Sequence, residues 1–413
     1  MTHSPFSGPT RLSRRSGLRT LAGALVLAST MPARLAFAAS ATGKSDGDQR
    51  LVVVLLRGAL DGLAAVPAPG DPAWADLRGT AEAAARAQAL SAATLAGNTA
   101  GIAAAQAPAL ALDTTFALHP ALGNLHQWYQ QKELLVVHAV ASHYRERSHF
   151  DAQQLLESGG DRPFAQSTGW LGRALQRSAK SAMALTAALP LALRGADRAS
   201  TWTPAGKAGT HADLLARVAQ MYGDDLQLAS ALGSAMGQQD MAMGAEGGPG
   251  LGGLARQAGA FLSDPKGPRV AWLEVGGWDT HTQQMGRLGR LLPSLDEALA
   301  ALRTSLGRHW PTTSVLVMTE FGRSATLNGT GGTDHGTAGV AFLAGGAVAG
   351  GRVLTDWPGL ARTQLLDARD LQPTLDIRRL IAPVVQKQFA LSAADLQASL
   401  PDAPRGLDGI YRA

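Results

Sequence analysis

Residues 269–275, Arg-Val-Ala-Trp-Leu-Glu-Val, and residues 314–318, Ser-Val-Leu-Val-Met, are the two apolar runs of the stretch Val270–Leu343. Continuous apolar runs of this length are typical of strands buried on both faces. The first leads into Gly276-Gly-Trp-Asp-Thr-His281, and the second into Thr319-Glu-Phe-Gly-Arg323 and Gly332-Thr-Asp-His-Gly336. Because open α/β sheets place their chemistry beyond the carboxyl ends of strands, these loops are predicted to form half of a metal-dependent site. Ordinary turn formation is the alternative role for their Asp, Thr and Gly residues.

Similar patterns recur along the chain and predict an α/β fold. Further strands are expected at 51–56, 133–139 and 339–344, and residues 186–194 allow a short strand or edge segment. Helices are expected at about 120–131, 151–157, 169–175, 212–232, 282–306 with an interruption at Pro293, 377–389 with a kink at Pro383, and 393–400. This alternation predicts a mainly parallel sheet with helices on both faces.

The N-terminus reads as an export signal. Residues 13–19, Ser-Arg-Arg-Ser-Gly-Leu-Arg, form a twin-arginine pattern, and a modest apolar run and Ala36-Phe-Ala38 follow. We expect cleavage after Ala38, with the twin-arginine translocon as a partner during export and a periplasmic or extracellular location. The apolar run is too short for a stable membrane span.

The remainder, 39–413, is expected to be a single α/β domain. An Ala-rich insertion lies at about 80–112, where a helix or a loose segment is possible. The middle section, about 195–265, is expected to form a helical cap over the sheet.

Charge and cysteine content narrow the chemistry. The chain has 37 basic and 32 acidic residues, but residues 1–38 hold five arginines and no acid, which leaves 32 of each sign afterwards. No basic stripe is left to bind nucleic acid. With no cysteine, a metal must be held by His, Asp, Glu and neutral oxygens. Zinc, manganese, calcium and magnesium are the divalent ions expected.

The other half of the site is predicted in two loops. Asp61 follows the strand at 51–56, and the loop after the second strand carries Arg147, Ser148 and His149. Ser148 is suited to cap the helix that follows, and the same position would let its hydroxyl meet or attack an anionic group. His138, inside the second strand, is expected to be a hydrogen-bonded core histidine.

The order of these motifs resembles a bacterial, twin-arginine-exported family known as domain of unknown function 1501, grouped with the alkaline phosphatase and sulfatase superfamily. The motifs are Leu-Arg-Gly-x-x-Asp-Gly, Arg-Ser-His-Phe, Gly-Gly-Trp-Asp-Thr-His, Thr-Glu-Phe-Gly-Arg and Gly-Thr-Asp-His-Gly, between about Leu51 and Leu400. The resemblance implies an alkaline phosphatase-like fold and a set of metal ligands: Asp61, Asp279, His281, Asp334 and His335. His149 is expected as a further ligand from the loop after the second strand, with His143 as the alternative. The resemblance also implies Ser148 as the nucleophile.

The predicted function follows from these ligands and from the resemblance. We expect a metal-dependent hydrolase of small phosphate or related anionic esters, acting through Ser148 or a metal-bound water, with Arg147 and Arg323 neutralising charge on the transferred group. A sulfatase formylglycine is unsupported, since there is no cysteine and Ser148 lacks the required surroundings. The superfamily has a further histidine ligand downstream, whereas no histidine follows His335. The alternative is therefore a non-catalytic, metal-stabilised binding or assembly protein of the cell envelope.

Overall fold

A nine-stranded mixed sheet lies at the centre of the computed structural model, which describes residues 48–97, 107–204 and 250–412. The strand order is β10-β4-β9-β8-β1-β7-β5-β6, and β11 pairs with β4. The strands are β1 (Arg50–Leu56), β4 (Leu134–Ala141), β5 (Ala182–Ala184), β6 (Ala199–Thr201), β7 (Val270–Val275), β8 (Thr313–Thr319), β9 (Gly339–Ala344), β10 (Arg352–Leu354) and β11 (Leu375–Asp376). A separate hairpin joins β2 (Leu110–Ala111) and β3 (Ala117–Leu118).

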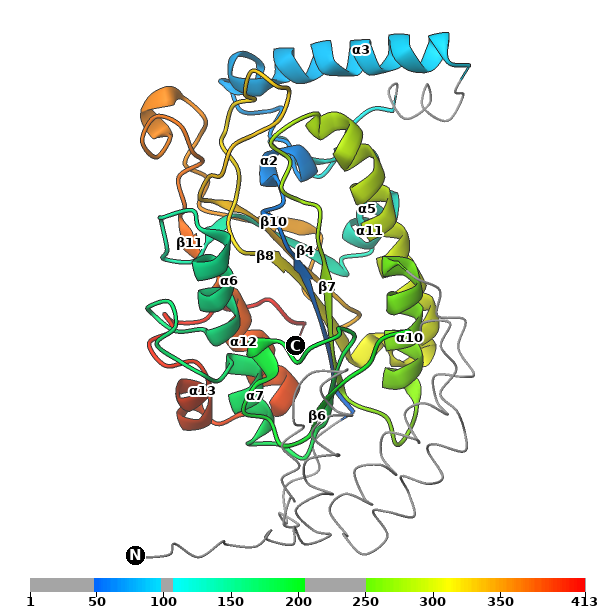
Figure 1. Ribbon diagram of the computed structural model, residues 1–413, viewed down its shortest axis with the longest axis vertical. Helices are drawn as coiled ribbons and strands as arrows, with labels where there is room; N and C mark the ends of the chain where they lie inside the picture. Colours follow the sequence, from blue (N-terminus) through cyan, green and yellow to red (C-terminus); the bar gives the residue numbers. More distant parts are fainter. Residues whose placement is uncertain (1–47, 98–106, 205–249, 413) are drawn as a thin grey trace, which may run out of the picture.

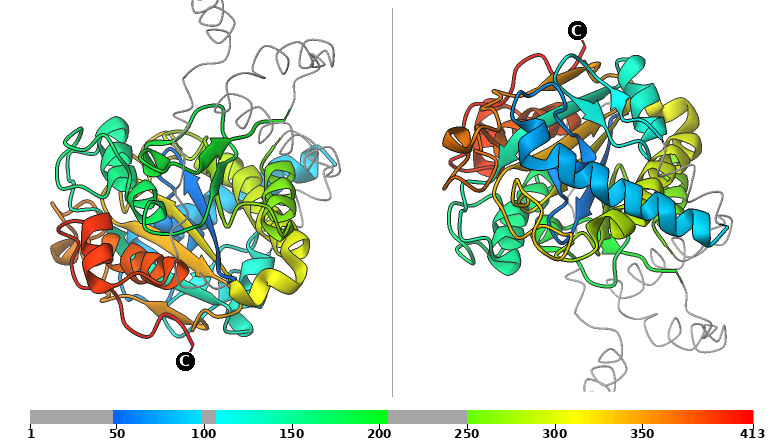
Figure 2. Two further views of the ribbon diagram at one scale, coloured as in Figure 1. Left: turned by 90° about the horizontal axis from the view of Figure 1, so that it is seen from below. Right: turned by 90° about the horizontal axis from the view of Figure 1, so that it is seen from above.

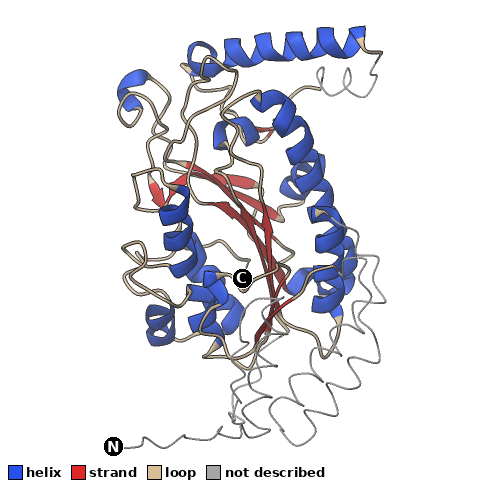
Figure 3. Cartoon of the chain, in the orientation of Figure 1, coloured by secondary structure: helices blue, strands red, loops and turns tan. Residues whose placement is uncertain are grey.

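Helices cover both faces of this sheet (Figures 1 and 3). Figure 2 shows the two helical layers on either side of the strands when the molecule is seen from below. One layer holds α5 (Gly123–Gln130), α10 (Leu251–Ser263) and α11 (Gln284–Leu306), and the other holds α6 (His149–Ser158), α7 (Trp170–Leu175), α12 (Arg378–Phe389) and α13 (Ala393–Ser399). The short helix α2 (Gly62–Ala65) follows β1, and α3 (Thr80–Leu95) runs across the top of the view in Figure 1.

Alternation along β1 explains the two layers. Val52, Val54 and Leu56 join the core cluster formed with α10 and α11, whereas Leu51, Val53 and Leu55 join the cluster formed with α7 and α12. All six side chains are almost fully buried, and burying each such side chain stabilises the fold by about 1.5–3 kcal/mol. A strand that is apolar at every position therefore requires cover on both faces, as its sequence predicted.

β9 is the strand that makes the sheet mixed. It runs antiparallel to both of its neighbours, β4 and β8, whereas β1 is parallel to β7 and β8. The start of β9 consequently lies at the same sheet edge as the end of β8. The connection 320–338 between the two strands stays at that edge, beside the loops that follow β1, β4 and β7.

Most of the predicted helices and strands are present, so the structure has the predicted α/β class. Its sheet is mixed. Two local predictions are wrong. The helix α11 continues through Pro293, where an interruption was predicted. Proline has no N–H to donate to the carbonyl oxygen of Gly289, four residues earlier, but Gly289 is exposed and its carbonyl oxygen can bond water. Residues 186–194 contain a 3₁₀ turn, Leu191–Leu193, and no strand. Pro190 lacks the N–H that a ladder position needs.

Several predictions concern residues outside the described ranges. The export signal 1–38, the helix expected at 212–232 and most of the cap expected at 195–265 lie there, as does part of the Ala-rich insertion. The described parts of that insertion contain α3 and the strand β2. Within the described residues, no helix combines the length and the hydrophobicity that crossing a bilayer demands.

Candidate metal centre

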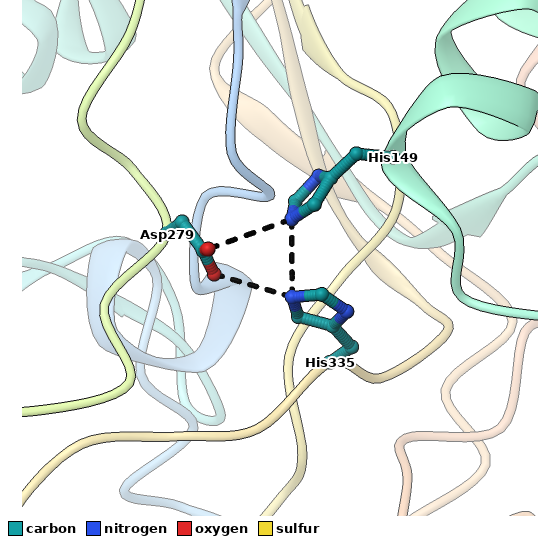
Figure 4. A group of neighbouring side chains, drawn as sticks. All are labelled: His149, Asp279 and His335. Carbon is teal, nitrogen blue, oxygen red and sulfur yellow. Dashed lines mark hydrogen bonds and ion pairs between the residues drawn. The ribbon is translucent and has the colours of Figure 1, made fainter.

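Three imidazoles and one carboxylate meet at the carboxyl edge of the sheet. His149 begins α6 after β4, Asp279 and His281 follow β7, and His335 precedes β9. Figure 4 shows the His149, Asp279 and His335 side chains pointing toward one another from three separate segments. These three residues form a group that could hold a metal ion. Residues as far as 186 positions apart in the sequence thus become neighbours.

His335 lies at the centre of the cluster. Its Nε2 atom is 3.0 Å from the Nε2 of His149 and 3.0 Å from the Nε2 of His281. The Oδ1 atom of Asp279 lies 3.2 Å from Nε2 of His335 and 3.0 Å from Nε2 of His281, and Oδ2 lies 3.7 Å from Nε2 of His149. Two of the rings also pack on Phe321, whose centroid is 4.8 Å from His149 and 5.2 Å from His335.

The outer ring nitrogens fix the tautomers of His149 and His335. Nδ1 of His149 donates to Oε1 of Glu320 at 2.8 Å, and Nδ1 of His335 donates to the carbonyl oxygen of Arg147 at 3.0 Å. With the Nδ1 proton committed in each neutral ring, both Nε2 atoms carry bare lone pairs. Two lone pairs facing each other across 3.0 Å repel unless a cation or a proton lies between them.

The cluster distances match the spacing of ligands around one small cation. For nitrogen ligands about 2.0–2.1 Å from tetrahedral zinc, neighbouring ligand atoms are separated by about 3.3 Å. The separations among His149, Asp279 and His335 run from 3.0 to 3.7 Å and bracket this value, and Nε2 of His281 lies 3.0 Å from the nearest atoms of His335 and Asp279. Outer-shell bonds such as His149 to Glu320 are characteristic of histidines that bind metals. The group of His149, Asp279 and His335 therefore fits a divalent ion.

Charged neighbours set the protonation of the ligand groups. Burial favours a higher pKa for Asp279, but the hydrogen bond and charge of Arg323 outweigh it and lower the pKa; Nη1 of Arg323 lies 2.6 Å from Oδ1. The hydrogen bond to Glu320 raises the pKa of His149, whereas burial and then the nearby His149 lower the pKa of His335. Asp279 is therefore ionised, as a ligand must be.

Asp334 lies at the rim of the cluster. Its Oδ1 atom is 3.4 Å from Nδ1 of His281 and accepts a hydrogen bond of 3.1 Å from Nδ2 of Asn328. The Asn328 bond and then that of His281 lower the pKa of Asp334. Asp334 thus contacts the outer nitrogen of His281, whose Nε2 faces the cluster.

Asp61 is placed elsewhere, within a buried polar network. Its carboxylate, in a residue 1% exposed, pairs with Nη1 and Nη2 of Arg78 at 2.9 and 2.6 Å and accepts from Nε2 of Gln284 at 2.6 Å. It also accepts the backbone N–H groups of Leu63 and Ala64 at the start of α2. Both Asp61 oxygens are occupied by side chains that carry N–H donors.

The predicted catalytic residues make other contacts. The Arg147 guanidinium pairs with Asp370 at 2.8 Å and reaches Asp367 at 3.4 Å, so its contact with the cluster is through its carbonyl group. Ser148 occupies the N-cap position of α6 without a capping bond, and the nearby Tyr144 hydroxyl donates to Asp151 at 2.8 Å. Arg323, 2% exposed, donates to Asp279 and to both the hydroxyl and the carbonyl of Thr333.

Comparisons with known proteins identify the family. A family model described as Protein of unknown function (DUF1501) matches residues 48–400. The chain belongs to the DUF1501 family. No curated protein matches the chain.

Solved structures similar to this DUF1501 chain are remote. They include Ps i-CgsB in complex with k-i-k-neocarrahexaose, at 8% identity and a TM-score of 0.35 over 72% of this chain, and BT1596, a 2-O GAG sulfatase, at 8% identity and a TM-score of 0.40 over 84%. The matched regions are 65% and 71% of those two chains, so this chain spans less than two thirds of the first. Similarity at such TM-scores indicates nothing about the reaction, and the chemistry has to come from the site itself.

Sequence reasoning missed several residues of this DUF1501 site. Arg78 and Gln284 bind Asp61, and Arg287, an exposed residue of α11, donates to the Asp279 carbonyl oxygen at 3.3 Å. None of them belongs to a recognisable motif. Gln284 had one usable signal, since it is a polar residue three positions after His281 at the start of an amphipathic helix.

Proposed function

We propose that this DUF1501 protein is an exported, metal-dependent hydrolase of phosphate or related anionic esters. The single observation that supports it best is the convergence of three Nε2 atoms and the Asp279 carboxylate, with the outer nitrogens of His149 and His335 already committed. Support for export comes from the twin-arginine pattern, and support for an alkaline phosphatase-like ancestry comes from the motif order. The mainly parallel sheet is inferred from the alternation of strands and helices, and the cap from the middle section at about 195–265.

We assign the ion to His149, Asp279, His281 and His335, with Asp334 supporting His281. Three imidazoles and one carboxylate favour zinc over calcium, magnesium and manganese, which prefer oxygen-rich sites. Asp61 belongs to the supporting network in this proposal, because Arg78 and Gln284 fill its carboxylate. The superfamily has a further histidine ligand downstream, which this chain lacks after His335. In this proposal His149, from the loop after β4, takes the place of that ligand.

In the proposed reaction, the bound ion and the side chains near it would promote hydrolysis of an ester. A bound divalent ion supplies Lewis-acid polarisation of an ester oxygen and acidifies nearby water or hydroxyl groups. Water gives one hydroxyl to the acid product and one hydrogen to the leaving alcohol, either directly or after a transient ester on Ser148. Arg287 is exposed and donates to the Asp279 carbonyl oxygen at 3.3 Å, and in this proposal its guanidinium meets the anionic substrate.

Purified mature protein provides the test. Metal analysis should find a divalent ion, and aryl phosphate mono- or diesters should be hydrolysed by wild type after zinc loading. His335→Ala should lose both properties, and Ser148→Ala should lose turnover while it keeps the ion if Ser148 is the nucleophile. A wild-type chain without bound ion and without esterase activity after zinc loading contradicts the proposal.

One observation favours a second function, a non-catalytic, metal-stabilised protein of the cell envelope. The guanidinium groups of Arg147 and Arg323 are both bound to carboxylates. Fewer groups are then left to clamp a substrate. Zinc that raises the melting temperature without any esterase activity, together with an unchanged phenotype of a Ser148→Ala strain, would support this function.

A further inference from the structure

Gln284 connects the two loops that carry the candidate ligands. It is the first residue of α11 and is 2% exposed. Its Oε1 atom accepts the Thr280 hydroxyl at 2.7 Å and the Thr333 hydroxyl at 2.7 Å. Thr280 lies between Asp279 and His281, and Thr333 directly precedes Asp334-His335. One amide oxygen therefore joins the Asp-Thr-His motif to the Thr-Asp-His motif.

The orientation of the Gln284 amide is fixed by its other end. Nε2 donates to Oδ2 of Asp61 at 2.6 Å, and Asp61 is in turn held by the fully buried guanidinium of Arg78. The two threonine hydroxyls fill the two lone pairs of Oε1, and a carboxylate accepts from the NH₂ group. Because both polar ends of the buried Gln284 amide have partners, the amide is held in one orientation.

The network ends on a candidate metal ligand. The Thr333 hydroxyl, which donates to Gln284, accepts from Nε of Arg323 at 3.1 Å. Nη1 of Arg323 donates to Oδ1 of Asp279 at 2.6 Å. Hydrogen bonds thus run without a break from Arg78 through Asp61, Gln284, Thr333 and Arg323 to the carboxylate in the cluster.

Main-chain contacts join the same two loops. The N–H of Gln284 donates to the carbonyl oxygen of Gly331 at 2.9 Å, and the N–H of Thr333 donates to that of Thr280 at 3.0 Å. At Gly332 an added Cβ atom would lie 2.2 Å from backbone atoms of His281. The loops are therefore in direct backbone contact, and the Gln284 side chain fixes their relative position beside that contact.

We infer that Gln284 is a positioning residue of the metal centre, which holds the Asp279-His281 loop and the His335 loop at the separation that one cation requires. The inference rests on the proposed metal site. Ligand groups must be held within about 0.5 Å of the working geometry by groups whose own positions are locked. Asp279 and His281 are 43% and 44% exposed and depend on this support more than a buried ligand would.

Gln284→Met tests the inference, because methionine has a similar volume and neither accepts nor donates a strong hydrogen bond. Gln388→Met is the matched control. Gln388 is also 2% exposed, and its amide donates to the Ser314 hydroxyl at the amino end of β8, away from the cluster. Zinc affinity is measured by competition with a chromophoric chelator, and the unfolding transition in urea is measured for the same samples.

The expected result is a zinc Kd at least about 10-fold weaker for Gln284→Met, the effect typical of losing an outer-shell partner, and an unchanged Kd for Gln388→Met. Should Gln284→Met not fold, Thr280→Val removes one of the two bonds to Oε1 and should weaken binding by about fivefold. Thr333→Val removes the other bond together with the bond from Arg323 Nε and should weaken binding at least as much. Equal Kd values for wild type, Gln284→Met and both valine variants would overturn the inference alone. Failure of the wild-type chain to bind zinc would overturn the proposed function, and this inference with it.

Discussion

Replacing Glu320 by Gln removes one negative charge behind a candidate ligand and leaves the shape of the side chain unchanged. Glu320 is 1% exposed, and its Oε1 atom accepts from Nδ1 of His149, Nε2 of Gln153 and the N–H of Gly58, each at 2.8 Å. The Thr319 hydroxyl donates to Oε2 at 2.9 Å. Four donors from three segments therefore converge on this carboxylate.

These donors keep Glu320 ionised despite its burial. Burial favours a higher pKa for the carboxyl group, but the hydrogen bonds from His149 and Gln153 outweigh it, and the pKa of Glu320 lies below its usual range. The ionised carboxylate makes Nε2 of His149 a stronger electron donor through the ring. A Gln oxygen can still accept the Nδ1 proton, but it lacks the charge.

The expected magnitude follows from this difference. Glu320→Gln should weaken zinc binding by about 10-fold, or about 1.4 kcal/mol, and Glu320→Ala, which removes the acceptor altogether, by about 100-fold, or about 2.7 kcal/mol. Isothermal titration with a competing chelator measures both changes. The graded series separates the loss of charge from the loss of the hydrogen bond.

Glu157→Gln serves as the control. Glu157, a residue of α6, is buried like Glu320, with 4% exposure. Its carboxylate binds Arg57 and the N–H of Ala192 and does not contact His149. Its replacement should leave the zinc Kd unchanged. If Glu320→Gln binds zinc as tightly as Glu157→Gln and wild type, the carboxylate does not support His149 and the reasoning is refuted.

Two further predictions concern other parts of the chain. Burial lowers the pKa of His138 from 6.5 to about 4. As the pH falls, the histidine is therefore protonated in the unfolded chain before it is protonated in the folded chain. The neutral ring makes its full contribution to the free energy of unfolding above pH 6.5, and about 3 kcal/mol of it is lost as the pH falls toward 4. Urea unfolding of His138→Gln should show a smaller acid loss, and an unchanged pH slope would contradict this. Gly332→Ala should force the backbone away from His281 and weaken zinc binding by at least about 10-fold, as the loss of an outer-shell partner does. A zinc Kd equal to that of the wild type in the same titration would show that the two loops can move apart without affecting the site.

Local patterns predicted the strands well, because burial on both faces leaves a direct mark on the sequence. β1, β7 and β8 are continuous apolar runs, and the structure buries them between two helical layers. The core role predicted for His138 is also confirmed: the residue is fully buried, and its Nε2 donates to the Val66 carbonyl oxygen. Strand direction leaves no such mark, since β9 is as apolar as β1, β7 and β8, which run parallel to one another.

The candidate site was predictable in part for the same reason. Motifs at strand ends identified His149, Asp279, His281 and His335, and the structure brings all four together. Asp61 also follows a strand, but its partner Arg78 lies 17 residues later in a π-helical turn, Ala75–Gly79. No local pattern reveals that an arginine will take up both oxygens of a carboxylate, because the pair is formed by tertiary packing.

The direction of β9 determines whether the cluster can exist at all. His335 precedes the first residue of β9 by only four positions, so its place depends on the edge at which that strand begins. A six-residue strand spans about 20 Å, and a parallel β9 would therefore start about that distance from the edge where β4, β7 and β8 end. The antiparallel direction places His335 beside His149 and lets one connection, 320–338, supply both Arg323 and His335. The reversed strand thus brings His335 to the candidate metal centre, beside the residues that follow β4 and β7.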